Sequence, residues 1–235
     1  MPFYEVIHSY PLEPSQRQTL AESITKLHAH TFTTPSFFVN VKFTQCDASD
    51  KSYFVAGVPK TTATNRIHAN VRTSASRTKA SFDKLAAEIE EAWYDAIDGE
   101  KQTEGKDEGK RPGAVDATDR DVQAKELLFV VFYPMIAVRE RGMTISEAGK
   151  EKEFFEEYLP IIRKKGEEGD EEYQSIIDEF EKREDLQKLL GGSGSGALSG
   201  LMERVGLGAQ VGGGKAGQQQ GDGKQERQQE VNGEK

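Results

Sequence analysis

Strand and helix patterns recur twice in the same order, and this order constrains the fold more than any other feature of the sequence. Residues 3–8 are short, aromatic and β-branched, which predicts a strand. Leu20, Ile24 and Leu27 then share one helical face, and residues 37–43 alternate between apolar and polar side chains, as a half-buried strand does. Together these segments predict a first β-α-β unit.

A second unit follows a further short strand predicted over residues 53–58. Residues 67–71 alternate again, and residues 82–96 carry apolar side chains at helical spacing. Residues 127–133 form an unbroken apolar run, which we expect to be a central strand covered on both faces. Because a β-α-β crossover makes its two strands parallel, the sequence predicts an α/β fold (α+β by stricter naming) of two tandem β-α-β units on one sheet.

The remaining segments divide the chain by composition. We expect one folded domain over residues 1–160, interrupted by a charged inserted loop at about 98–124. An acidic helical extension is predicted over 161–190, and a disordered tail over 191–235, which holds 14 of the 23 glycines. Seven apolar residues form the expected docking faces of the C-terminal helices: Phe154, Phe155, Tyr158, Leu159, Ile176, Ile177 and Phe180.

Composition narrows the functional classes. Acidic residues outnumber basic ones, 40 to 31, and the formal net charge of −9 repels nucleic acid and anionic lipid. No apolar run approaches the roughly 18 residues that cross a bilayer, and residues 3–7 are too short and interrupted for a signal segment. Cys46 is the single cysteine, which excludes an intramolecular disulfide and fits a reducing compartment. We therefore expect a cytoplasmic protein with no nucleic-acid or membrane partner.

Pro2 carries chemistry only if Met1 is removed, which a small second residue such as proline generally permits. Proline at the chain terminus is a secondary amine, and the reference pKa of an α-amino group, about 8, can be tuned in either direction. The free amine can take a proton from a carbon acid, and its cation can donate one. Many proteins begin Met-Pro without consequence, but here Pro2 leads directly into the first strand of the doubled pattern.

Three segments resemble the tautomerase superfamily, and within it the cis-3-chloroacrylic acid dehalogenase group: PFY at 2–4, SITKLH at 23–28 and FVNVKF at 38–43. The resemblance covers roughly residues 2–159. Enzymes of this group are fused two-unit β-α-β chains that assemble as trimers around an N-terminal proline. The resemblance therefore implies a homotrimer in which Pro2 acts as general acid or base on a small unsaturated or 2-keto carboxylic acid, without a cofactor.

The resemblance assigns substrate binding to His28, Arg72 and Arg77. Two guanidinium groups suit a carboxylate because each offers a planar fork of donors, although both arginines could equally be solvated surface charges. Four residues separate the two arginines here, whereas two separate them in the family, so the sequence leaves their convergence open. His28 and His30 would not share a helix face, and we expect no metal site.

Glu140 stands at the spacing of the family's water-activating glutamate, although it could also be part of a charged turn. The family's water-positioning tyrosine corresponds to Phe129, which cannot donate a hydrogen bond. Tyr133 lies on the same predicted strand face and could supply a hydroxyl from another position. Water activation by Glu140 would give hydration or dehalogenation. Without it the site would perform keto-enol tautomerisation, which the loss of the tyrosine favours.

A second hypothesis is a non-catalytic oligomeric scaffold that retains the tautomerase fold. The altered arginine spacing, the missing tyrosine and the long C-terminal extension favour this hypothesis. The presence of Pro2, His28 and Glu140 at the family's positions favours catalysis instead. The sequence leaves the physiological substrate and the role of the extension open.

Overall fold

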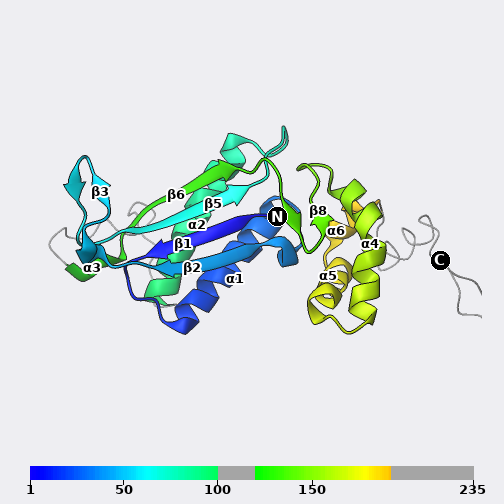
Figure 1. Ribbon diagram of the computed structural model, residues 1–235, viewed down its shortest axis with the longest axis horizontal. Coiled ribbons are helices and arrows are strands. Elements are labelled where there is room, and N and C mark those ends of the chain that lie inside the picture. The colour runs from blue at the N-terminus through cyan, green and yellow to red at the C-terminus, as the bar shows by residue number, and fades with distance from the viewer. Residues whose placement is uncertain (100–119, 192–235) are drawn as a thin grey trace, which may run out of the picture.

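The computed structural model describes residues 1–99 and 120–191, which form two packed units (Figure 1). A sheet with two long helices makes up the first unit, and three helices make up the second. Residues 100–119 of the predicted inserted loop and residues 192–235 of the predicted tail lie outside the described residues. No helix in the described part of the chain is both long enough and apolar enough to cross a membrane.

The first unit contains six main elements: β1 (Phe3–His8), α1 (Pro14–Thr31), β2 (Asn40–Gln45), β5 (Asn65–Val71), α2 (Lys79–Asp98) and β6 (Leu127–Pro134). The strands form one sheet in the order β2-β1-β5-β6. β1 is parallel to β2 and β5 is parallel to β6, whereas the central pair, β1 and β5, is antiparallel. The prediction of two β-α-β units on one sheet is therefore confirmed.

The first hydrophobic core lies between the two helices and one face of the sheet. Tyr4 and Val6 of β1 and Ile67 of β5 are fully buried there, while the residues that alternate with them face away. Trp93 of α2 is also fully buried, and its indole N–H donates to the carbonyl oxygen of Lys125 at 2.9 Å. This bond ties α2 to the short helix α3 (Arg120–Lys125), which precedes β6.

The strand predicted over 37–43 is wrong at its start. A 3-10 helix, η1 (Ser36–Phe38), occupies the first positions, and β2 begins only at Asn40. Pro35 fixes its own backbone angle at the entry to this turn. Phe38 is buried in a second hydrophobic core and not in the sheet. Its apolar side chain therefore packs outside the strand that the alternation predicted.

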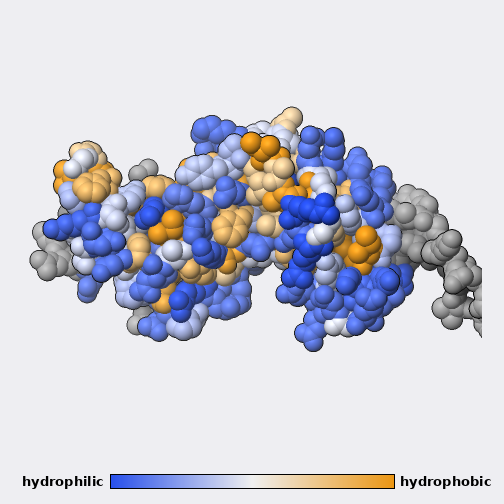
Figure 2. Space-filling view, in the orientation of Figure 1, coloured by the Kyte–Doolittle hydropathy of each residue, from blue (hydrophilic) through white to orange (hydrophobic). Residues whose placement is uncertain are grey.

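The strand predicted over 53–58 is instead a hairpin, β3 (Phe54–Val55) and β4 (Val58–Pro59). Ala56 and Gly57 between them have φ angles of 51° and 79°, as a two-residue type I′ turn requires. The hairpin projects from the end of the sheet opposite the N-terminus (Figure 1), and its tip is apolar in Figure 2. The exposed apolar side chains there are Phe54, Val55 and Val58.

β6 is an edge strand, so the prediction of a central strand covered on both faces is wrong. Val130 and Phe132 pack against the first core, as one face of the apolar run requires. Phe129 and Tyr133 on the other face are 37% and 41% exposed. The run over 127–133 is therefore apolar on both faces although the single chain covers only one of them.

The second unit consists of α4 (Glu151–Glu167), α5 (Glu171–Lys182) and α6 (Glu184–Leu189) around their own hydrophobic core. All seven predicted docking residues belong to this core or pack against it, so that prediction is confirmed. Phe38 and Met143 join the core from outside the three helices. The predicted boundary at residue 160 falls inside α4.

Arg183 joins the helical unit to the end of α1. Its guanidinium donates to the carbonyl oxygens of Thr34 and Ala29, each at 3.0 Å, and pairs with Glu179 and Asp185, each at 2.6 Å. The side chain is only 14% exposed. The carbonyl oxygen of Ala29 also accepts from the backbone N–H of Thr34 at 3.0 Å, so Arg183 adds a second donor there while it fixes the second unit to the end of α1.

We predict that Arg183→Ala lowers the free energy of unfolding by about 2–4 kcal/mol, because two carboxylates lose a largely buried counter-charge and two carbonyls lose donors. Lys164→Ala is the matched control: its ion pair with Glu168 is 76% and 53% exposed, so the change should stay within ~0.5 kcal/mol. Urea unfolding followed by circular dichroism measures both values. Equal effects of the two substitutions would contradict the role of Arg183.

Candidate active site

The N-terminus lies at the junction between the sheet and the helical unit (Figure 1). Pro2 is buried directly before β1, and its carbonyl oxygen accepts from the backbone N–H of Asn40 at 3.1 Å. Met1 packs against the second core. It also lines a cavity of about 10 Å³ together with Phe38 and Arg72, close to the room that one water molecule needs. The amino end of the chain is therefore enclosed by protein.

Arg72 and Arg77 converge, and they meet at the carboxylate of Glu151. Their Nη2 atoms lie 3.2 Å and 2.7 Å from the same oxygen, Oε1 of Glu151. Oε2 of Glu151 accepts from the backbone N–H of Gly149 at 2.7 Å, and Nη1 of Arg72 donates to the carbonyl oxygen of Ser146 at 2.6 Å. The two arginine side chains are 11% and 6% exposed, and that of Glu151 is 9% exposed. Two cations and one anion thus form a buried cluster.

The four-residue spacer between the arginines folds into a turn. The backbone N–H of Arg77 donates to the carbonyl oxygen of Ser74 at 3.1 Å, and the same two residues form an isolated β-bridge. Thr78 then caps α2 by accepting from the backbone N–H of Ser81 at 3.2 Å. Because the turn takes up the extra residues, Arg77 returns toward Arg72, which spacing along the sequence could not show.

His28 lies near the C-terminal end of α1 and is 1% exposed. Its Nδ1 is 2.8 Å from the hydroxyl of Tyr4, and its ring meets that of Phe32 edge-on with 5.0 Å between centroids. Its Nε2 has no hydrogen-bond partner among the described residues. Burial, and then the positive charge of Arg77, lower the pKa of His28 well below its usual value, so the ring is neutral at physiological pH. His30 is exposed, as the different helix faces predict.

Glu140 belongs to a small hairpin, β7 (Arg139–Glu140) and β8 (Met143–Thr144). Its Oε2 is buried and has no hydrogen-bond partner within the described part of the chain. Burial raises the pKa of Glu140, while the nearby α-amino group, in its protonated form, and a hydrogen bond with Asn40 oppose that rise. The hairpin therefore brings a partly desolvated carboxyl group within electrostatic reach of the N-terminus.

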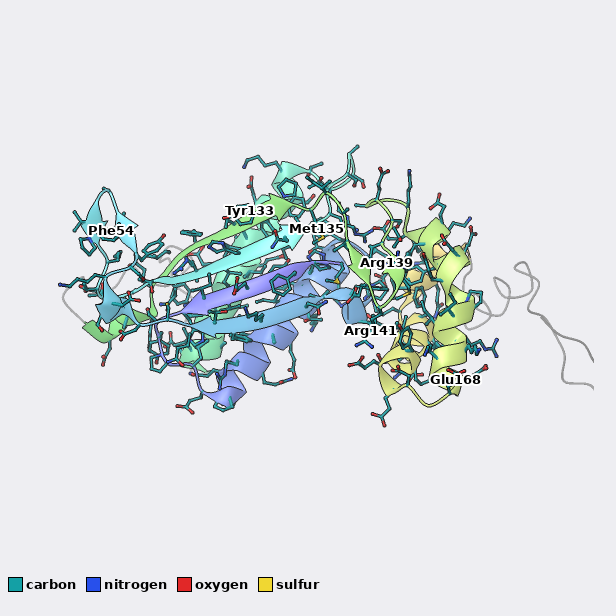
Figure 3. All side chains as sticks on the ribbon, in the orientation of Figure 1. Phe54, Tyr133, Met135, Arg139, Arg141 and Glu168 are labelled. Atoms are coloured by element: carbon teal, nitrogen blue, oxygen red, sulfur yellow. The ribbon has the colours of Figure 1, made fainter. Side chains whose placement is uncertain are left out.

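Arg141, at the turn of this hairpin, contacts the helical unit. It forms an ion pair with Glu172, and its guanidinium carbon lies 5.2 Å and 5.7 Å from the ring centroids of Phe37 and Tyr173. Figure 3 shows Arg141 beside the C-terminal helices. The residue next to Glu140 thus anchors the hairpin to α5.

Burial and neighbouring charges set the basicity of the α-amino group at Met1. Burial lowers its pKa most, and Arg72 and Arg77 lower it further, whereas Glu140 and Glu151 raise it. The result is a pKa of about 4, against about 8 for an unperturbed α-amino group. This amine is therefore unprotonated at neutral pH.

Tyr133 is not brought to this cluster within one chain. Its hydroxyl is 3.5 Å from Nδ1 of His68, and the two ring centroids are 5.7 Å apart on the sheet face that the helices leave uncovered. His28 lies on the opposite, helix-covered face of the sheet. There both arginines and the N-terminus lower its pKa, in addition to the effect of burial. The structure gathers the N-terminus, His28, the arginines and Glu140, and it leaves Tyr133 apart.

Glu151 is the residue of this cluster that sequence reasoning missed. It is the first residue of α4 and lies 79 and 74 positions after its arginine partners. An acidic residue in the first turn of a helix is common because it complements the helix dipole, so the sequence offered no reason to connect it with the arginines. Within the described residues, no group of three or more His, Cys, Asp or Glu side chains could hold a metal ion.

The fold and the cluster define a protein of two β-α-β units that encloses its N-terminal amine beside a pair of arginines. Residues 1–154 match the family Tautomerase_3, described as "Putative oxalocrotonate tautomerase enzyme". The chain belongs to this family of the tautomerase superfamily. The matched region ends inside α4, three residues after Glu151.

Several solved structures are similar to the chain at low sequence identity. A member of the cis-3-chloroacrylic acid dehalogenase family is 22% identical over 65% of this chain and 90% of that chain, with a TM-score of 0.44. A fused 4-OT, an asymmetric trimer, is 15% identical over 60% and 94%, with a TM-score of 0.41. Leishmania major MIF2 is 15% identical over 62% and 97%, also with a TM-score of 0.41. No curated protein matched the sequence.

Proposed function

We propose that the chain is a tautomerase in which Pro2, freed by removal of Met1, acts as general base on a small carboxylic acid of the unsaturated or 2-keto type. The observation that carries this proposal is the buried N-terminal amine under the influence of Arg72 and Glu140. Removal of Met1 would leave the amine on Pro2, one residue further along the same enclosed segment. Membership of a tautomerase family supports the same conclusion.

The basicity expected for the Pro2 amine selects its role. Burial and the charge of Arg72 hold the pKa of the Met1 amine at about 4, and both causes would also act on an amine at Pro2. An amine with a pKa below neutrality is free at pH 7 and can accept a proton. Pro2 would take a proton from the carbon beside a carbonyl group, and the resulting cation would return it elsewhere on the conjugated system. That proton shift is keto-enol tautomerisation.

Unpartnered polar atoms support a bound ligand in this cluster. Nε2 of His28, Nε of Arg72 and Oε2 of Glu140 are buried without partners among the described residues, whereas buried polar groups are normally hydrogen-bonded. The hydroxyl of Tyr4 can donate to Nδ1 of His28, which leaves the proton of the neutral ring on Nε2. His28 and Arg72 would then both offer donors to the oxygens of a carboxylic acid.

Hydration or dehalogenation is a second candidate, because Glu140 offers an unpartnered carboxyl oxygen near the amine. Such a group could accept a proton from an attacking water. Tyr133 does not reach the cluster within its own chain, so we place tautomerisation first. The spacing of the arginines, which favoured a non-catalytic scaffold, does not keep them apart.

We also propose that the chain assembles as a homotrimer. One face of its sheet is covered by helices, while Phe129 and Tyr133 on the other face remain 37% and 41% exposed. The hairpin of β3 and β4 adds a projecting apolar tip (Figure 2). Exposed apolar patches of this kind mark association surfaces. Copies of the chain would cover each other's open sheet faces.

For protein whose Met1 removal is verified by intact mass, we expect turnover of phenylpyruvate, 2-hydroxymuconate or cis-3-chloroacrylate. Pro2→Ala should lower kcat/KM about 100-fold or more, because positioned proton transfer typically contributes 10²–10⁴-fold. Pro11→Ala, at an exposed internal proline, is the control and should leave kcat/KM unchanged. No turnover, or equal turnover in the Pro2 variant, would overturn the role of Pro2.

The pH profile of tautomerisation gives an independent prediction. The active form of the amine is unprotonated, and a lowered pKa keeps that form populated to more acidic pH. We therefore expect kcat/KM to rise with pH through the amine pKa and to level off well below pH ~8, the reference value. If kcat/KM instead rose only at or above pH ~8, the result would contradict a base that is buried beside two arginines. Activity that falls as the amine deprotonates would assign the amine as an acid.

Light scattering during size-exclusion chromatography tests the assembly. We expect a mass about three times the 26.1 kDa of one chain. Phe129→Glu should shift the protein toward monomer, because it places a charge on the open sheet face. Ile161→Glu on α4, where the native side chain is 49% exposed, should leave the mass unchanged. A monomeric native protein would contradict the proposal.

A further inference from the structure

We propose that Glu151 is an internal carboxylate ligand of the arginine pair, which a substrate carboxylate must displace before it can bind both arginines. The inference rests on the proposed function and concerns the same site, since it makes α4 a competitor for the substrate. Glu151 would thus set the affinity and selectivity of the site for carboxylic acids.

The geometry of Glu151 is that of a bound carboxylate. One oxygen receives both guanidinium groups, from Arg72 at 3.2 Å and from Arg77 at 2.7 Å. The other oxygen receives the backbone N–H of Gly149 at 2.7 Å. Charged donors on a carboxylate make the strongest of the ordinary hydrogen bonds. The position between Nη2 of Arg72 and Nη2 of Arg77, where a substrate carboxylate would bind, is therefore occupied by a carboxylate of the protein itself.

The burial of the cluster makes the competition unavoidable. The three side chains are at most 11% exposed, and two buried guanidinium groups without a nearby anion would be strongly unfavourable. A second carboxylate placed beside Glu151 would meet its negative charge at close range. If the substrate carboxylate replaces Glu151, the net charge of the cluster stays the same. We therefore expect a ligand to bind by displacing Glu151.

The start of α4 is built in a way that allows Glu151 to leave. Lys150 is the residue before the helix and makes no side-chain capping bond. Gly149 has a φ of 93°, a left-handed conformation that favours glycine, and nothing lies within 4 Å of where a Cβ would stand. The first buried apolar side chain of α4 is Phe154. Glu151 is therefore held mainly by the polar contacts that a ligand would replace.

A ligand would also gain a contact that Glu151 does not make. Nε of Arg72 is buried and has no partner among the described residues. Arg72 and Glu151 both line the small cavity that Met1 borders, so removal of Met1 would open space next to the arginine.

Glu151→Ala provides a direct test, because the four heavy atoms that it removes are those of an acetate ion. In protein with Met1 removed, acetate should stabilise this variant against thermal unfolding by roughly 3 °C or more once its concentration is about ten times Kd. Sodium chloride at equal ionic strength and neutral acetamide should not. Glu153→Ala, at an exposed position of the same helical turn, is the matched control, and it should respond to acetate no more than the native protein does.

Calorimetric titration with acetate should then show binding to Glu151→Ala at least about tenfold tighter than to the native protein, since the native site must first release Glu151. Equal affinity in the two proteins, or no acetate binding by a folded Glu151→Ala variant, would overturn the inference. If that variant fails to fold, the native protein carries the test through hydrogen exchange at the amide of Gly149. Saturating acetate should accelerate this exchange, and unchanged exchange would reject displacement.

The binding and activity measurements separate this inference from the proposed function. If the chain is a tautomerase and Glu151 competes, Glu151→Ala should lower KM by the same factor as the acetate Kd. If neither the native protein nor the variant turns over any substrate, and acetate still binds Glu151→Ala more tightly than the native protein, the proposed function is wrong. The role of Glu151 as an internal ligand is then supported. Turnover by the native protein with equal acetate affinity in both forms would sustain the function and sink the inference.

Discussion

The carboxylate of Glu151 between two buried guanidinium groups is the interaction on which the relation of the two units depends. Arg72 directly follows β5 and Arg77 lies just before α2, so both cations belong to the sheet unit. Glu151, their anion, is the first residue of α4. Buried arginines require a counter-charge, and the helical unit supplies it. The same cluster places the first residue of α4 beside the small cavity that Met1 lines. Arg183 adds a second polar tie at the end of α1.

Burial also gives the N-terminus its chemical character. In a solvated loop the same amine would be protonated at neutral pH, and the arginines would be ordinary surface cations. Enclosure between the sheet end and the second core lowers the pKa of the Met1 amine and, by a similar cause, keeps His28 neutral. The helical unit is thus part of the environment of the site and not an appendage to it.

The sequence predicted the fold well because the fold depends on periodic burial. β5 and both long helices follow from the spacing of apolar residues, while β1 and β6 follow from short runs of aromatic, β-branched or apolar residues. The prediction of β6 as a central strand was wrong. An unbroken apolar run indicates that both faces of a strand are apolar, but it does not indicate that the same chain covers both. The sequence could not predict that Arg72 and Arg77 converge, because their convergence depends on the turn between them and on a partner residue in α4.

The hairpin of β7 and β8 places two consecutive side chains in different surroundings. Glu140 belongs to the electrostatic neighbourhood of the amine, while Arg141 stacks on aromatic rings and pairs with Glu172 of α5. A single peptide bond therefore separates the catalytic candidate from the support of the C-terminal helices. A substitution of Glu172 or Tyr173 in α5 would therefore act on the position of Glu140 through its neighbour Arg141.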